Sequence, residues 1–114
     1  CIVNGAKDSL QTFKKARNET TILFNNAIHP GEPDGVNACL ILLDEVLASG
    51  LNMEHMPVLA FIPAYNVGGM INRSSNSRAN QNGPNEYGFR GNAQNLDLNR
   101  DFIKMDSRNS KIIS

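Results

Sequence analysis

The feature that most constrains this fold is a pair of strand-like segments separated by one helix-like segment, with short connections. Residues 21–29 are rich in β-branched and aromatic side chains, which predicts a strand. Residues 57–62 form a nearly continuous apolar run that ends at Pro63, as expected for a strand buried on both faces. Connections this short favour a strand–helix–strand unit with parallel strands.

The segment between the strands has a clear helical period over residues 33–49. Pro33 suits the first helical position, Asp34 adds negative charge to the first turn, and Gly50 follows the end. The apolar side chains that fall on one helix face are Val36, Cys39, Leu40, Leu43, Val46 and Leu47. We therefore expect an α/β fold with a mixed, largely parallel central sheet flanked by helices (an α/β/α sandwich), and Cys39 in its core.

Asparagine is unusually frequent: there are sixteen, and eight of them lie within residues 72–99. Because Asn favours turns, this bias predicts a long structured loop, a kind of loop that is often functional. After a short apolar segment at 98–104, a helix is expected to start with Asp106 or Ser107 as its cap. The sequence stops within that helix, so residues 1–114 are interpreted as the N-terminal portion of one domain.

Composition excludes two classes of function. Eleven Lys and Arg balance eleven Asp and Glu, which argues against a dedicated nucleic-acid binder. The apolar runs fall well short of the ~20 residues that span a bilayer. The loop arginines Arg73, Arg78 and Arg90 do not form a basic patch with aromatics between them, and on their own they indicate solvated side chains.

Two clusters carry chemistry. His29 and Glu32 lie three apart around Pro-Gly where the first strand meets the helix, and both are zinc-ligand types. On spacing alone, a surface histidine that caps a turn is the better interpretation. Asn99 and Arg100 lie in the second cluster and could grip an anion; alternatively, Asp97 and Arg100 form a structural ion pair.

Together the clusters resemble the zinc carboxypeptidases of the carboxypeptidase A/B and D/N type. The resemblance rests on the His-x-x-Glu pair, on Asp-Leu-Asn-Arg-Asp-Phe at residues 97–102, which is similar to the family's Asp-Leu-Asn-Arg-Asn-Phe, and on Arg90 within Gly-Phe-Arg-Gly-Asn. The last segment resembles Gly-Arg-Asn-Asn of the D/N branch. The resemblance covers roughly residues 22–104.

This resemblance implies a zinc-dependent exopeptidase acting on peptides, or peptide-like substrates, with a free C-terminal carboxylate. His29 and Glu32 would be two of three ligands of one Zn²⁺. Arg90 would polarise the scissile carbonyl, and Asn99 and Arg100 would clamp the terminal carboxylate. Asp97 would orient the neighbouring loop. The family resemblance also favours a secreted or periplasmic location.

Two family features lack a counterpart in the sequence: the third ligand, a histidine, and the general-base glutamate. His55 is interpreted as a turn histidine near solvent. Both missing groups are expected in the remainder of the catalytic domain, so residues 1–114 alone are expected to be inactive. Gly31 stands where many pancreatic-type members have arginine.

Three alternatives stay open. An N-acyl amino acid deacylase resembling aspartoacylase or succinylglutamate desuccinylase would use the same two motifs. A peptidoglycan-peptide amidase of the same fold would also fit. A non-catalytic module could use Asn99 and Arg100 to hold peptide C-termini.

Overall fold

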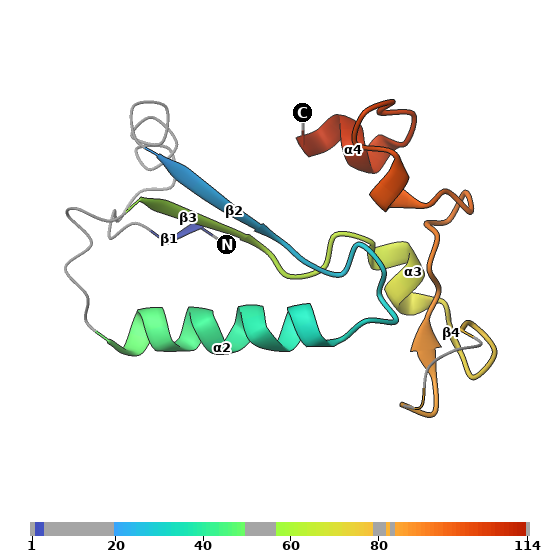
Figure 1. The fold of residues 1–114 in the computed structure, drawn as a ribbon, viewed down its shortest axis with the longest axis horizontal. Helices are drawn as coiled ribbons and strands as arrows, with labels where there is room; N and C mark the ends of the chain where they lie inside the picture. Colours follow the sequence, from blue (N-terminus) through green and yellow to red (C-terminus); the bar gives the residue numbers. More distant parts are fainter. Residues whose placement is uncertain (1, 4–19, 50–56, 79–81, 83, 114) are drawn as a thin grey trace.

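A computed structural model describes residues 2–3, 20–49, 57–78, 82 and 84–113. It consists of a small sheet with one long helix along it, followed by a group of short elements beyond one end of the sheet (Figure 1). The turn expected to hold His55 lies outside the described residues.

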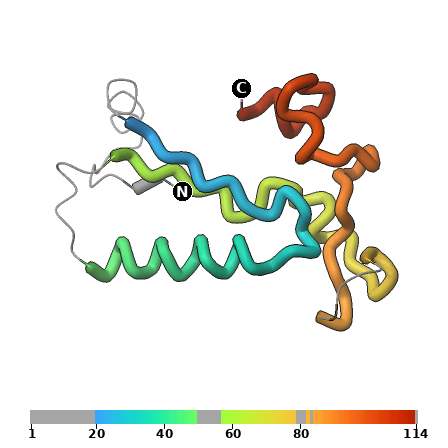
Figure 2. The backbone as a smooth tube through the Cα atoms, in the orientation of Figure 1, coloured from blue at the N-terminus to red at the C-terminus, as the bar shows by residue number. Residues whose placement is uncertain are grey.

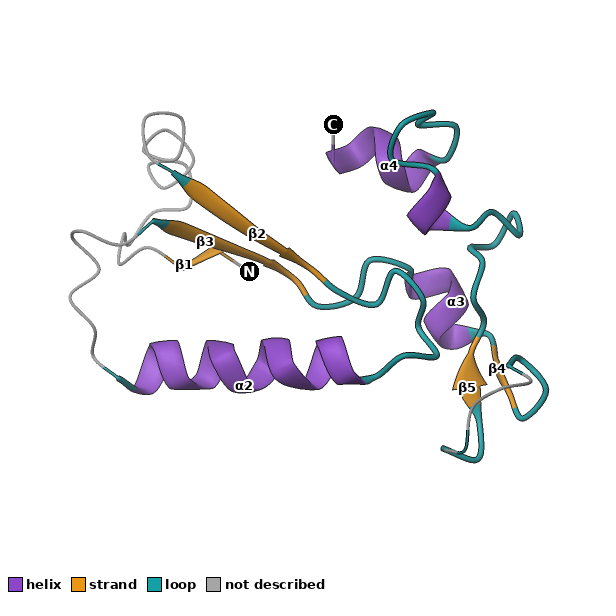
Figure 3. Ribbon diagram, in the orientation of Figure 1, coloured by secondary structure: helices purple, strands orange, loops and turns teal. Residues whose placement is uncertain are grey.

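The sheet confirms the strand–helix–strand unit. Its strands are β1 (Ile2–Val3), β2 (Thr21–Asn25) and β3 (Val58–Ile62), in the order β1-β3-β2. β2 runs parallel to β3 in continuous register, whereas β1 is antiparallel to β3. Helix α2 (Asp34–Ala48) connects β2 to β3 and lies along the sheet (Figure 3). The described chain is thus mixed α/β, with a helix packed on one face of its sheet.

Strand β2 is shorter than the sequence predicted, which was a strand over residues 21–29. It ends at Asn25, and Ala27 has a φ of 51°, in the left-handed region that extended backbone does not occupy. The chain turns after Asn25, so His29 lies outside the sheet. This turn brings His29 close to the start of α2 rather than in line with the strand.

The core lies between α2 and β3. It contains Cys39 and Val46 from the helix and Leu59 and Phe61 from the strand, with Phe24 of β2 packed against them. The Phe24 and Phe61 rings stack with centroids 4.8 Å apart and planes 9° apart. The prediction that Cys39 is a core residue is confirmed.

The predicted apolar face of α2 is wrong at two positions. Leu40 and Leu47 are 50% and 65% exposed. The residues that contact the core instead follow a narrower stripe: Cys39, Leu42, Leu43 and Val46. A sheet of this width covers only a narrow stripe of a helix, so the flanking leucines of the period stay at the surface.

The Asn-rich segment contains an antiparallel ribbon that the sequence did not predict. After the short helix α3 (Val67–Ile71), strand β4 (Arg73–Ser74) pairs with β5 (Tyr87–Gly88). The 3₁₀ turn η2 (Leu98–Arg100) and helix α4 (Arg108–Ile113) follow. Figure 2 shows these elements gathered beyond the end of the sheet where α2 begins. None of the helices in the described ranges has the length and apolar character needed to cross a membrane.

The start of α4 is fixed by a buried carboxylate. Asp101 accepts hydrogen bonds from the backbone N–H groups of Asp106 and Ser107, at 2.8 and 2.9 Å, and from the Ser110 hydroxyl at 2.5 Å. Hydrogen bonds from Ser107 and Ser110 lower the pKa of Asp101 well below its ordinary value. The Ser107 hydroxyl accepts from the Ser110 N–H at 3.1 Å, which confirms Ser107 as the helix cap.

The ring of Phe102, next to Asp101, stacks on Tyr65 with centroids 5.9 Å apart. Asn109 of α4 donates to the Tyr65 carbonyl at 3.3 Å. These contacts tie the C-terminal elements to the loop that follows β3.

Candidate functional site

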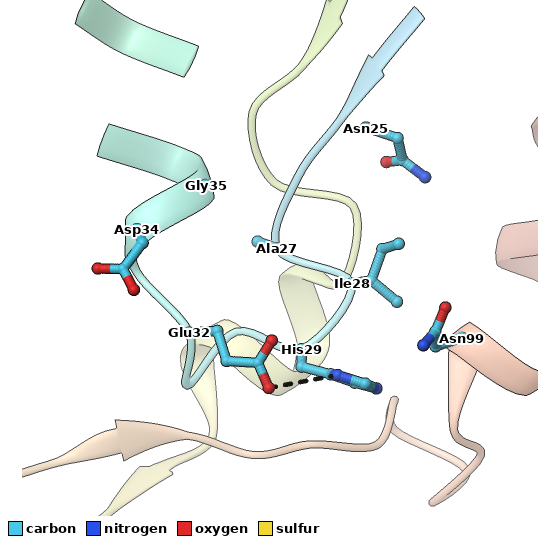
Figure 4. A pocket seen from close by; sticks show the side chains of 8 residues that line it. All are labelled: Asn25, Ala27, Ile28, His29, Glu32, Asp34, Gly35 and Asn99. Atoms are coloured by element: carbon cyan, nitrogen blue, oxygen red, sulfur yellow. Dashed lines mark ion pairs between the residues drawn. The ribbon is translucent and has the colours of Figure 1, made fainter. Parts of the chain in front are cut away.

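His29 and Glu32 lie on one tight turn at the carboxyl end of β2, just before α2 (Figure 4). The Glu32 N–H donates to the His29 carbonyl at 3.0 Å, which closes the turn. Gly88 of the ribbon packs against this turn so closely that a Cβ there would lie 2.6 Å from the Cβ of Pro30. The ribbon therefore packs directly against the turn that carries His29 and Glu32.

The two side chains point at each other with the spacing of two ligands of one metal. Nδ1 of His29 lies 3.5 Å from Oε1 of Glu32 (Figure 4). Two ligands of a tetrahedral zinc ion, each ~2.0–2.2 Å from the metal, lie about 3.4 Å apart. The residues present fit a zinc ion with two protein ligands. The described ranges contain no group of three or more His, Cys, Asp or Glu side chains able to hold a metal.

The other nitrogen of His29 is held by Asp97. Nε2 lies 2.8 Å from Oδ1 of Asp97, and the imidazole is 8% exposed. A carboxylate only accepts hydrogen bonds, so Nε2 donates to Asp97. In the neutral ring, Nδ1 then presents a lone pair toward Glu32. Nδ1 and the Glu32 oxygen are then two acceptors that face each other, and a cation between them would satisfy both. In metal-binding histidines the far nitrogen usually donates to a carboxylate, a backbone carbonyl or water, and Asp97 is such a partner.

Asp97 joins this histidine to Arg90. Its Oδ2 accepts from Nε and Nη2 of Arg90 at 3.2 and 3.1 Å, and its Oδ1 accepts from the Asn99 N–H at 3.0 Å. The hydrogen bond from His29, together with those from Arg90 and Asn99, outweighs desolvation and lowers the pKa of Asp97 to about 2. The suggested ion pair between Asp97 and Arg100 is wrong, because Asp97 pairs with Arg90.

An open pocket of about 440 Å³ lies in front of His29 and Glu32. Its lining residues, drawn in Figure 4, are Asn25, Ala27, Ile28, His29, Glu32, Asp34, Gly35 and Asn99. The structure therefore brings together three of the five predicted site residues. Arg90 is linked to them through Asp97. The exposed side chain of Arg100 does not line the pocket and donates to the Asn99 carbonyl at 3.5 Å.

One contact of the site was missed from sequence. Nη1 of Arg78 donates to Oε1 of Glu32 at 2.8 Å. Burial acts to raise the pKa of Glu32, but the hydrogen bond and charge of Arg78, aided by the charges of His29 and Arg90, hold that pKa below its ordinary value. The interpretation of Arg78 as a solvated loop arginine is wrong. The two residues are 46 positions apart, so their spacing held no signal.

Asn66, which is completely buried, connects the loops of the site. Its side-chain amide donates to the carbonyls of Gly91, Arg90 and Ile28 at 3.0, 3.3 and 3.4 Å, and its oxygen accepts from the Gly69 N–H at 2.9 Å. Ile28 precedes His29, so one side chain ties the segment that carries His29 to the one that carries Arg90.

We expect Asn66→Ala to lower the free energy of unfolding by about 2–4 kcal/mol, because it leaves several buried backbone groups unpaired. Urea denaturation followed by circular dichroism would measure this loss. Asn85→Ala, at an exposed asparagine, is the matched control and should change stability by less than ~0.5 kcal/mol. Equal effects of the two substitutions would contradict the role assigned to Asn66.

Comparisons with known proteins returned nothing similar: no protein-family model matches the chain, and neither a curated protein nor a solved structure is significantly similar to it. The case for a function therefore depends on the residues themselves and on the contacts between them.

Proposed function

We propose that this chain is part of a zinc-dependent metallocarboxypeptidase, a hydrolase that releases C-terminal amino acids from peptides. The observation that carries the proposal is the pair of facing acceptors, Nδ1 of His29 and Oε1 of Glu32, 3.5 Å apart, with the far nitrogen of His29 held by Asp97. With the His29 ring neutral, such an arrangement suits a bound dication better than it suits the two side chains alone.

His29 and Glu32 would hold one Zn²⁺, whose chemistry is to polarise a carbonyl and to lower the pKa of bound water. The third protein ligand and the general-base glutamate would belong to the remainder of the catalytic domain. Within this chain, Asp97 keeps the His29 ring in the tautomer that presents Nδ1 to the site.

Arg90 supplies fixed positive charge beside the proposed metal site. Its guanidinium is held through Nε and Nη2 on Asp97, while 43% of the side chain remains exposed. A cation positioned in advance stabilises negative charge that develops on a carbonyl oxygen without reorganising at that moment. This geometry supports the role of Arg90 in stabilising the oxyanion.

The proposed clamp for the substrate carboxylate is the pair Asn99 and Arg100 on η2. The Asn99 side chain lines the pocket in front of His29, and Arg100 is its neighbour on the same turn. An amide donor beside a guanidinium suits a carboxylate, which accepts from both. An exposed arginine at this place can turn toward a substrate anion without breaking a buried contact.

Three substrates test the proposed function on the protein at its natural length. One is a peptide with a free C-terminus, the second is the same peptide as its C-terminal amide, and the third is an N-acyl amino acid. We expect release of the last residue from the free-acid peptide, lost on metal chelation and restored by zinc. Preferential cleavage of the N-acyl amino acid would instead assign a deacylase. Binding of the free-acid peptide without cleavage would assign a non-catalytic module.

Arg100→Ala is expected to raise KM for the free-acid peptide by about 10²-fold, as for loss of a charge-assisted hydrogen bond. For the amide, KM should change little. The acid-to-amide ratio of kcat/KM measures the difference, and Arg108→Ala, at another exposed arginine, is the control. An unchanged ratio in Arg100→Ala would mean that Arg100 does not bind the carboxylate.

A further inference from the structure

Arg78 contacts the very oxygen of Glu32 that faces His29. Its Nη1 is 2.8 Å from Oε1, and the same Oε1 is 3.5 Å from Nδ1 of His29. The Arg78 side chain is 23% exposed, whereas that of Glu32 is 53% exposed. The less exposed arginine therefore restrains the more exposed partner, a glutamate on a turn.

The path of Arg78 to Glu32 crosses Gly31. A Cβ on Gly31 would lie 2.7 Å from Cδ of Arg78 and 3.0 Å from the Gly88 carbonyl oxygen. The first separation is closer than real Cβ atoms allow, so any larger residue at this position must displace the arginine. Gly31 is thus the residue that leaves room for a guanidinium from a distant segment to reach Glu32.

We propose that Arg78 is a positioning residue for the metal site, which holds the Glu32 carboxylate toward His29 and thereby raises the affinity for zinc. This proposal rests on the proposed function, since it assumes that His29 and Glu32 bind the metal. A carboxylate oxygen has two lone pairs, so Oε1 can accept from Arg78 and still face a metal. Hydrogen-bond partners of metal ligands commonly contribute 10–100-fold to metal affinity.

A second effect of Arg78 opposes the first. Its positive charge repels a dication, but exposure of Glu32 lets water screen that repulsion. The two effects have opposite signs, and this makes the proposal testable: positioning predicts that loss of Arg78 weakens zinc binding, and repulsion predicts that it strengthens binding.

The experiment measures the zinc dissociation constant of the metal-stripped, natural-length protein by competition with a chromophoric chelator. Arg78→Ala should raise the dissociation constant about 10-fold or more, and Arg78→Lys, which keeps charge and a donor, should lie between it and wild type. Circular dichroism checks that each variant is folded. A dissociation constant that is unchanged or lower in Arg78→Ala overturns the proposal.

Gly31→Ala gives an independent arm. Alone, it should also weaken zinc binding, because its methyl group displaces the arginine. Combined with Arg78→Ala, it should add little, since no arginine side chain remains to be displaced. If the losses of zinc affinity in Gly31→Ala and Arg78→Ala add fully in the double variant, displacement of Arg78 is not the reason why Gly31→Ala weakens binding.

The two proposals fail in different ways. A wild-type protein without a zinc site that depends on His29 would contradict the proposed function and this inference together. A zinc site that is lost in His29→Ala but unchanged in Arg78→Ala would contradict only the role of Arg78.

Discussion

Replacing His29 by alanine is expected to abolish zinc binding and to lower kcat/KM for peptide hydrolysis by at least about 10³-fold. The substitution removes one of the two proposed ligands in this chain and leaves the Asp97 carboxylate without its imidazole partner. Without His29, the zinc ion would keep two of its three proposed protein ligands. Two ligands hold zinc poorly compared with three, so we expect no catalytic site to remain. Metal content after dialysis, measured by mass spectrometry, and progress curves with a free-acid peptide give the two readouts.

His55→Ala is the matched control, because His55 is the other histidine of the chain. We expect this variant to keep both its zinc and its activity. A zinc content of His29→Ala equal to that of the wild type would show that the zinc is bound elsewhere. Loss of zinc in both variants would point to a general effect on folding rather than to ligation.

The second large effect is expected from Arg90→Ala, with kcat lower by about 10²–10³-fold and KM little changed. That is the range for loss of one group that stabilises a developing oxyanion. Zinc should stay bound, because the Asp97 carboxylate still has His29 and the Asn99 N–H as donors. Steady-state kinetics and metal content on the same preparation measure the two quantities.

Arg73→Ala provides the comparison for Arg90, since its guanidinium donates to the Glu86 carbonyl at the ribbon. It should leave kcat within about twofold of wild type. An effect of Arg90→Ala on KM alone would reassign the residue to substrate binding in the ground state. Loss of zinc in that variant would mean that Arg90 acts through Asp97 and His29.

The local parts of the fold could be predicted from the sequence. The helix over residues 33–49 and the two flanking strands follow from side-chain periods that the chain carries within a few turns. Ser107 as a helix cap depends on one residue and its neighbours. Such features are set by contacts near in sequence, and their patterns are visible without the fold.

The contacts that organise the site could not be predicted in this way. His29 meets Asp97 across 68 positions, and Glu32 meets Arg78 across 46. Each strand of the ribbon is two residues long, too short to show an alternating pattern. The motifs indicated which residues carry chemistry, but only the fold gave each one its partner.

The early end of β2 has a similar cause. Residues 26–28 look extended by composition, yet Asn26 and Ala27 accept hydrogen bonds from the N–H groups of Tyr65 and Asn66 in the loop after β3. Those tertiary bonds accompany the left-handed backbone at Ala27. The residue pattern of one segment does not show which distant loop will bind its backbone carbonyls, so it could not predict where β2 ends.

The positions of the tyrosines make the two parts of the molecule separately observable. Residues 1–114 contain no tryptophan, and their two tyrosines, Tyr65 and Tyr87, are both buried in the group of elements around α3 and the ribbon. Cys39 instead lies on the buried face of α2, in the core between that helix and the sheet. For the 114-residue chain with Cys1→Ser, thiol labelling of Cys39 reports opening of the sheet and helix, and tyrosine emission reports loosening of the site. Denaturation midpoints that coincide would show that the metal-site loops unfold cooperatively with the core, and midpoints that differ would make those loops a separate unit.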